Sequence, residues 1–146
     1  MAAAKLLKNT RDKKMVAFKS NMFVFMAIVA SMTFCISAME HAVGDDSGWV
    51  TPENPNFYID WAANKTFTVG DTLLFDFYTG LHDVTPVIKE DYDRCSVTVP
   101  GTTIKTGPAT LNLYIPGDHY FICSMDGDCL DNQKLAIHVV DNDSSN

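Results

Sequence analysis

Residues 119–140 read HYFICSMDGDCLDNQKLAIHVV, and this stretch decides the fold. Both of its ends, residues 119–124 and 134–140, are rich in aromatic and β-branched side chains, as β-strands are. In the second run Leu135, Ile137 and Val139 fall on one face, because side chains alternate along a strand. The loop between the runs is rich in Asp, Gly and Asn, which favour turns. Two strands joined in this way are typical of an antiparallel sheet.

The same pattern continues toward the N-terminus. Short strands are predicted at residues 66–69, 72–78, 84–88 and 111–115, separated by turn residues. Pro86 lacks a backbone N–H and so indicates an edge strand or a bulge. No convincing helical period is found, although residues 89–94 could hold one helical turn. Strands at this spacing indicate an antiparallel sandwich or barrel, and we expect a single all-β sandwich of about 100 residues.

Three of the four histidines are not expected to bind a ligand. His138 points away from the apolar face of its strand, so we expect a surface or edge position. His119 stands at a strand entrance, where it could pack or form a local hydrogen bond. His41 lies at the start of the domain, and the sequence assigns it no role.

Charge divides the chain into two parts. Residues 1–38 carry six basic residues and one acidic residue, whereas residues 39–146 carry five basic and seventeen acidic residues. The net charges are therefore +5 and −12. Because phosphate repels so acidic a surface, we expect no binding of nucleic acid by the second part.

An apolar run of 15 residues, 22–36, follows the basic segment and leads to Ser37 and Ala38. This order predicts a secretory signal peptide over residues 1–38. A bilayer-spanning helix needs roughly 20 residues, so retention as an uncleaved anchor is disfavoured. The mature chain is expected to begin near Met39. A cut after Ala42 and a translation start at Met15 are the alternatives.

The rest of the chain divides into a domain over residues 39–141 and a short polar tail over residues 142–146. The tail lacks the apolar segment of a glycolipid anchor, so no stable membrane anchor is expected in the mature chain. Asn64 and Asn142 each begin an Asn-x-Ser/Thr sequon and are candidate glycosylation sites. We therefore expect a secreted, extracellular glycoprotein.

The cysteines of the domain are odd in number. Cys35 lies in the predicted signal peptide, which leaves Cys95, Cys123 and Cys129. In an oxidising compartment two of these should pair, and spacing alone does not choose among the three pairings. A bond between Cys95 and Cys129 would close a loop of 34 residues and contribute roughly 3–4 kcal/mol in the chain-entropy model.

A series of motifs carries a resemblance to one family. They are VGDDSGW at 43–49, NFY at 56–58 with WA at 61–62, VGDTL at 69–73, YDRC at 92–95, GPAT at 107–110 and HYFICS at 119–124. With His82 in GLHDV at 80–84, they make the chain resemble the phytocyanins, the plant branch of the blue-copper cupredoxins. The resemblance covers residues 41–140 and implies a cupredoxin-like Greek-key β-sandwich.

The resemblance also implies a copper site and a disulfide. Phytocyanins hold one copper ion with two histidines, a cysteine thiolate and a weak axial ligand, which is Met in most and Gln in the stellacyanin type. On this pattern His82, Cys123 and Gln133 are the candidate copper ligands. Cys95 and Cys129 match the pair that forms the family's disulfide, so Cys123 stays free. The cofactor expected is a single, type 1-like copper ion.

Asp128 occupies the position of the family's second histidine. Its carboxylate is a hard oxygen donor, which would favour Cu(II) over Cu(I) or a zinc ion. Asp128 could also turn to solvent as an ordinary loop residue. The sequence therefore predicts a weakened copper site, with Asp128 in the place of its second histidine.

Two functions of different classes follow from these observations. The first is a secreted single-electron carrier with a weakened mononuclear copper site. The alternative is a copper-free binding or structural module of the early nodulin-like type, and a zinc or copper buffer is a third. No nucleophile–base pair is visible, so no enzyme is expected. The expected partners are an unidentified redox protein or a component of the extracellular matrix or cell wall. We expect the protein to be a monomer in the apoplast.

Overall fold

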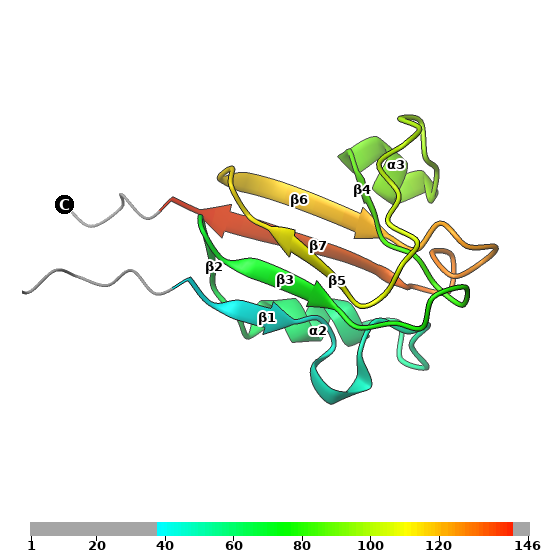
Figure 1. Ribbon diagram of the computed structural model, residues 1–146, viewed down its shortest axis with the longest axis horizontal. Coiled ribbons are helices and arrows are strands. Elements are labelled where there is room, and N and C mark those ends of the chain that lie inside the picture. Colours follow the sequence, from blue (N-terminus) through cyan, green and yellow to red (C-terminus); the bar gives the residue numbers. More distant parts are fainter. Residues whose placement is uncertain (1–37, 142–146) are drawn as a thin grey trace, which may run out of the picture. The chain divides into compact units, whose positions relative to one another are not determined.

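The computed structural model describes residues 38–141, which form two β-sheets (Figure 1). One sheet has the strand order β1–β3–β5 and the other has the order β2–β7–β6–β4. The strands are β1 (Glu40–Ala42), β2 (Phe67–Thr68), β3 (Thr72–Phe75), β4 (Thr85–Val87), β5 (Ala109–Asn112), β6 (Gly117–Ile122) and β7 (Lys134–Val140). The predicted signal peptide up to residue 37, Cys35, Asn142 and the polar tail lie outside the described residues, so these remain predictions.

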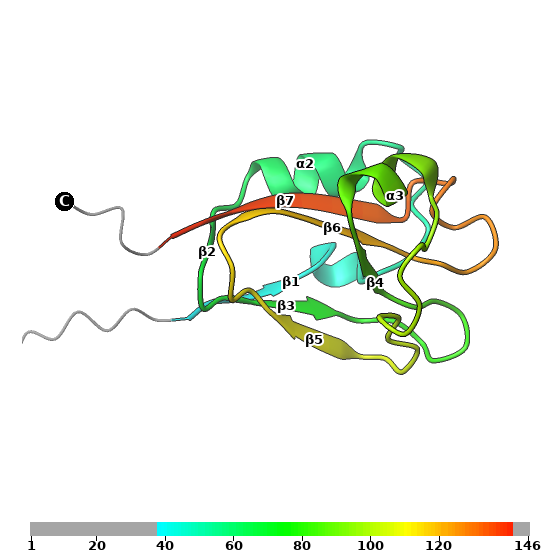
Figure 2. The same cartoon turned by 90° about the horizontal axis from the view of Figure 1, so that it is seen from above.

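The two sheets are stacked as layers, and the chain passes from one sheet to the other at each connection from β1 to β6 (Figure 2). Two helices, α2 (Phe57–Ala63) and α3 (Lys89–Arg94), cover the outer face of the four-stranded sheet. A single 3-10 turn, η1 (Asp45–Ser47), follows β1. Within residues 38–141 no helix has the length and apolar character required to cross a membrane.

The core lies between the two sheets. In β7 the side chains of Leu135, Ile137 and Val139 are buried while His138 is exposed, as the alternation of apolar residues predicts. The aromatic side chains of Trp49 and Phe75 are fully buried and meet edge to face. Burial of this apolar surface is the main source of stability in a domain of this size.

All six predicted strands are present, several with shifted bounds, but a seventh strand, β1, was not predicted. β3 ends at Phe75 rather than at residue 78, because the next backbone carbonyl, of Asp76, accepts the N–H of Trp49 instead of continuing the ladder with β5. β4 is an edge strand, as Pro86 indicates. The single helical turn expected at residues 89–94 is α3.

The prediction that the chain has no other helix was wrong. The segment α2 buries Tyr58 and Trp61, which are three residues apart and therefore share one helix face. Only two large side chains mark that face, and a helix of seven residues is too short to establish a period.

His41 has a structural role that the sequence did not indicate. It lies in β1, which pairs in parallel with β3, and its side chain is buried. Its Nε2 lies 3.0 Å from Oδ2 of the buried Asp71, and its ring packs 4.7 Å from that of Phe67. Asp71 also accepts the backbone N–H groups of Met39 and Thr68. One buried carboxylate therefore fixes the start of the domain.

Candidate metal centre

The predicted ligands come from loops at one end of the sandwich (Figures 1 and 2). His82 lies between β3 and β4, Cys123 directly follows β6, and Asp128 lies in the loop that leads to β7. Gln133 is the last residue before β7. Two sheets stacked face to face bring these loops together, although His82 and Asp128 are 46 residues apart in the chain.

Asp128 lies at the centre of the cluster. Its Oδ2 is 2.8 Å from Nδ1 of His82 and 3.1 Å from Sγ of Cys123. The Sγ of Cys123 and Nδ1 of His82 are 4.0 Å apart. One possible ligand atom from each of the three residues lies within 4.8 Å of the others. Asp128 is therefore turned into the site and not out to solvent.

Thr51 connects Asp128 to the fourth candidate ligand. Its hydroxyl lies 3.0 Å from Oδ1 of Asp128 and 3.1 Å from Oε1 of Gln133. The side chain of Gln133 is fully buried, and its Nε2 has no hydrogen-bond partner. No sequence signal marks Thr51, because 77 residues separate it from Asp128 and 82 separate it from Gln133.

The backbone of the β6–β7 loop is held by its own hydrogen bonds. Cys123 N–H donates to the carbonyl of Gln133 at 3.0 Å, and Gln133 N–H donates to the carbonyl of Asp128 at 2.9 Å. These bonds bring the two ends of the loop together and turn its three candidate ligands toward the same region.

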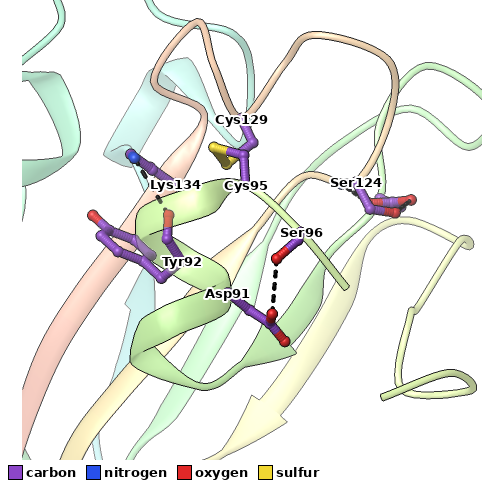
Figure 3. The surroundings of a disulfide bond; sticks show 8 residues. Asp91, Tyr92, Cys95, Ser96, Ser124, Cys129 and Lys134 are labelled. Atoms are coloured by element: carbon purple, nitrogen blue, oxygen red, sulfur yellow. Dashed lines mark hydrogen bonds between the residues drawn. A yellow bond between two sulfur atoms is a disulfide. The ribbon is translucent and has the colours of Figure 1, made fainter. Parts of the chain in front are cut away.

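A disulfide ties the loop to α3. Cys95, at the end of α3, is bonded to Cys129, and Figure 3 shows the bond joining the helix to the loop. Nearby, Lys134 donates to the carbonyl of Tyr92 and lies 4.8 Å from the centre of its ring. The pairing implied by the family resemblance is confirmed, and Cys123 is a free, buried cysteine.

Asp83 joins the His82 loop to the Cys123 strand. Its carboxylate accepts the backbone N–H and the hydroxyl of Ser124, each at 2.6 Å. Its own N–H donates to Sγ of Cys123 at 3.5 Å, and its carbonyl accepts the indole N–H of Trp49 at 2.8 Å. The position of His82 relative to Cys123 is therefore set by buried groups on both sides.

The pKa values of Asp128 and of the neighbouring Cys123 are both shifted. Burial raises the pKa of the Cys123 thiol to about 12, and the neighbouring Asp128 carboxylate contributes to the rise because it disfavours a second negative charge. Burial would also raise the pKa of Asp128. Hydrogen bonds from Cys123, His82 and Thr51 outweigh that effect, so the pKa of Asp128 lies below its usual value.

The donor set fits a mononuclear transition-metal ion. Imidazole and thiolate suit copper and zinc, and a carboxylate oxygen adds a harder donor. The buried, unpartnered amide of Gln133 offers a further polar group beside the cluster. Among the described residues, His82, Cys123 and Asp128 are the side chains placed to hold a metal ion, and His82 is the one histidine of this group.

The other predicted residues lie elsewhere. His119 bonds to the carbonyl of Ile115 at 2.7 Å, and His138 bonds to Asp118 at 2.6 Å on the surface, as their strand positions suggested. Neither replaces the missing second histidine. Asn64 is exposed at the C-terminal end of α2, and its glycosylation remains a prediction.

Comparisons with known proteins identify the family of this domain. The family model of the plastocyanin-like domain matches residues 49–133. Cucumber peeling cupredoxin from Cucumis sativus is 43% identical over 102 residues, which cover 68% of this chain and 74% of that protein. A blue copper protein from Arabidopsis thaliana is 39% identical over 123 residues, but the match spans only 61% of its length and 84% of this chain. Early nodulin-like proteins of Arabidopsis thaliana also match.

The solved structure of cucumber stellacyanin with Cu²⁺ covers 73% of this chain and 98% of its own, with 40% identity and a TM-score of 0.69. The expected cupredoxin-like sandwich is therefore confirmed. Blue copper proteins and stellacyanins are electron carriers and not enzymes. The matched domain, the shared fold and the Cys95–Cys129 disulfide together show that this chain belongs to the phytocyanins.

Proposed function

We propose that the chain is a secreted single-electron carrier, in which His82, Cys123 and Asp128 would hold one copper ion and Gln133 would offer a fourth, weaker ligand. The observation that supports this proposal is the convergence of three different donor atoms within 4.8 Å. Bound copper would supply reversible exchange between Cu(II) and Cu(I). The residues of the chain provide the donors and hold them in place.

Each residue has a separate task in this proposal. Cys123 supplies a soft thiolate, which stabilises the reduced state, and His82 supplies an imidazole suited to both states. Asp128 supplies a hard, anionic oxygen, which favours the oxidised state and weakens the site as an electron acceptor. The disulfide and the Asp83 hydrogen bonds limit movement of the ligands. Little rearrangement would therefore accompany a change of charge.

The proposal extends to compartment and partner. The predicted signal peptide and the disulfide fit an extracellular protein, and the phytocyanins are extracellular or cell-surface proteins. A net charge of −12 over residues 39–146 would steer the domain toward basic surfaces, with a strong dependence on ionic strength. We propose a basic redox protein or a cell-wall component as the partner of a monomeric domain.

A second candidate function is supported by the same hydrogen bonds. Asp128 accepts hydrogen bonds from His82 and Cys123, so the cluster is satisfied without a metal ion. In that case the domain is a copper-free extracellular binding module of the early nodulin-like type. The thiol would then be an inert buried residue.

A copper titration of residues 39–146, produced with the disulfide oxidised, separates the two functions. The electron carrier should bind one equivalent and develop an intense thiolate-to-copper absorption with a narrow copper hyperfine splitting in electron paramagnetic resonance. Cys123→Ser is the matched control and should abolish that absorption while keeping the fold. A weak, broad signal identical in both proteins would favour the copper-free module. Zinc that stabilises the fold without colour would indicate a metal buffer.

A further inference from the structure

The hydroxyl of Thr51 lies between two acceptors and can donate to only one of them. Oδ1 of Asp128 is 3.0 Å away and Oε1 of Gln133 is 3.1 Å away, but a hydroxyl carries a single proton. At the same time Nε2 of Gln133, which carries two protons, is buried and has no partner. The Thr51 hydroxyl thus faces two acceptors, whereas Nε2 of Gln133 has no acceptor.

A half-turn of the Gln133 amide about its terminal bond removes both conflicts. The two ends of an amide occupy nearly the same space, so the hydrogen-bond network decides their orientation. After the turn Nε2 donates to the Thr51 hydroxyl, and that hydroxyl donates to Asp128. The atom that remains unpaired is then the carbonyl oxygen of Gln133. An amide oxygen can serve as a metal ligand, whereas the NH2 group of an amide cannot.

We propose that Thr51 is a positioning residue of this site, whose hydroxyl accepts the N–H of Gln133 and donates to Asp128. This relay would fix the direction of the Gln133 amide and leave its oxygen available. It would also hold Oδ1 of Asp128, so that Oδ2 stays with His82 and Cys123. The part of the proposal that concerns a metal ion rests on the copper site proposed above.

The backbone around Thr51 is held firmly enough for this task. The hydroxyl of Tyr58 accepts the N–H of Val50 at 2.9 Å and donates to the carbonyl of Val50 at 2.6 Å. Tyr58 is itself buried and packs 4.8 Å from the ring of Trp49. Pro52 restricts the residue before it to extended conformations. Thr51 is therefore presented to Asp128 by a segment fixed on both sides.

The test compares Thr51→Val with Thr51→Ser in residues 39–146. Valine keeps the shape of threonine and removes the hydroxyl, whereas serine keeps the hydroxyl. Thr102→Val is the control, because its hydroxyl bonds only to the nearby carbonyl of Val99 in an exposed loop. In the metal-free protein, nuclear magnetic resonance of the Gln133 side-chain amide should show one N–H proton shifted by Thr51→Val. In Thr51→Ser the resonance of that proton should return to its wild-type chemical shift.

Copper ion alone is then added to each protein. Loss of a group that orients a ligand lowers metal affinity by about 10–100-fold, so Thr51→Val should weaken copper binding at least tenfold and alter the visible spectrum. Thr51→Ser should restore both. If the wild-type domain binds no copper, the proposed function fails, while the amide shift still supports the relay. An unchanged Gln133 amide signal in Thr51→Val would overturn the relay, whatever the copper result.

Discussion

Oδ2 of Asp128 lies 2.8 Å from Nδ1 of His82, in a position where the phytocyanin pattern places a second histidine. The same oxygen lies 3.1 Å from Sγ of Cys123. Asp128 therefore joins the two strongest candidate ligands through protons that a bound metal ion would replace. The disulfide and the other candidate ligands lie around it, so the carboxylate changes the chemistry of the donor set.

Asp128→His should create a strong blue-copper site. The change supplies a second imidazole beside His82 and Cys123, and it removes the hard oxygen donor that favours Cu(II). We expect the copper-loaded variant to show a more intense visible absorption than the wild-type domain and tighter copper binding. Absorption spectroscopy and competition with a copper chelator measure the two effects. Asp126→His, an exposed position of the same loop, is the control. A colourless copper-treated Asp128→His protein would contradict the ligand assignment.

The thiol of Cys123 should be unreactive in the folded, metal-free domain. The side chain is fully buried, and burial raises its pKa to about 12, so almost no thiolate is present at pH 8. An aromatic disulfide reagent should therefore release no colour from the native protein and one equivalent after denaturation without reductant. Cys123→Ser should release none in either state. Two or more equivalents after denaturation would show that Cys95 and Cys129 are not bonded in solution.

The sequence predicted most of the fold, and it named the three side chains that the structure brings together, because strong signals carry both. The alternation in β7 and the turn residues around it are local, and the ligands lie in motifs of a known family. What the sequence missed depends on contacts between distant residues. Thr51 is one polar residue before a proline, and only the folded chain brings it to Asp128 and Gln133. His41 likewise gains its partner Asp71 only when β1 joins β3.

The mature domain should require the residues that precede Val43. Glu40–Ala42 form β1, and His41 is buried against Phe67 and Asp71. A chain that begins at Val43 loses this strand and leaves the buried Asp71 without two of its donors. We expect the free energy of unfolding of such a chain to be about 2–4 kcal/mol lower than that of a chain that begins at Met39, because hydrogen bonds and buried surface are lost. Urea unfolding measures this difference. Equal stability of the two chains would instead allow cleavage after Ala42.

Asp71 should make the stability of the domain depend on pH in the acid range. Burial would raise the pKa of Asp71, but the hydrogen bonds from Met39, His41 and Thr68 outweigh it and lower the pKa. A carboxyl group with a lowered pKa in the folded state stabilises the protein above its unfolded pKa of about 3.9. That stabilisation is lost as the pH falls through the folded value. Asp71→Asn should therefore destabilise the domain by about 1–3 kcal/mol at pH 7 and by less below pH 3.

Urea unfolding of the wild-type domain and of Asp71→Asn across pH 2–7 measures this difference. Asp126→Asn changes the net charge by the same amount at an exposed position, so it corrects for general charge effects. The gap between wild type and Asp71→Asn should be widest above pH 5 and should close toward pH 2, while the gap for Asp126→Asn stays small throughout. A gap for Asp71→Asn that did not change with pH would contradict this prediction, because it would mean that ionisation of the Asp71 carboxyl group adds nothing to the stability of the folded domain.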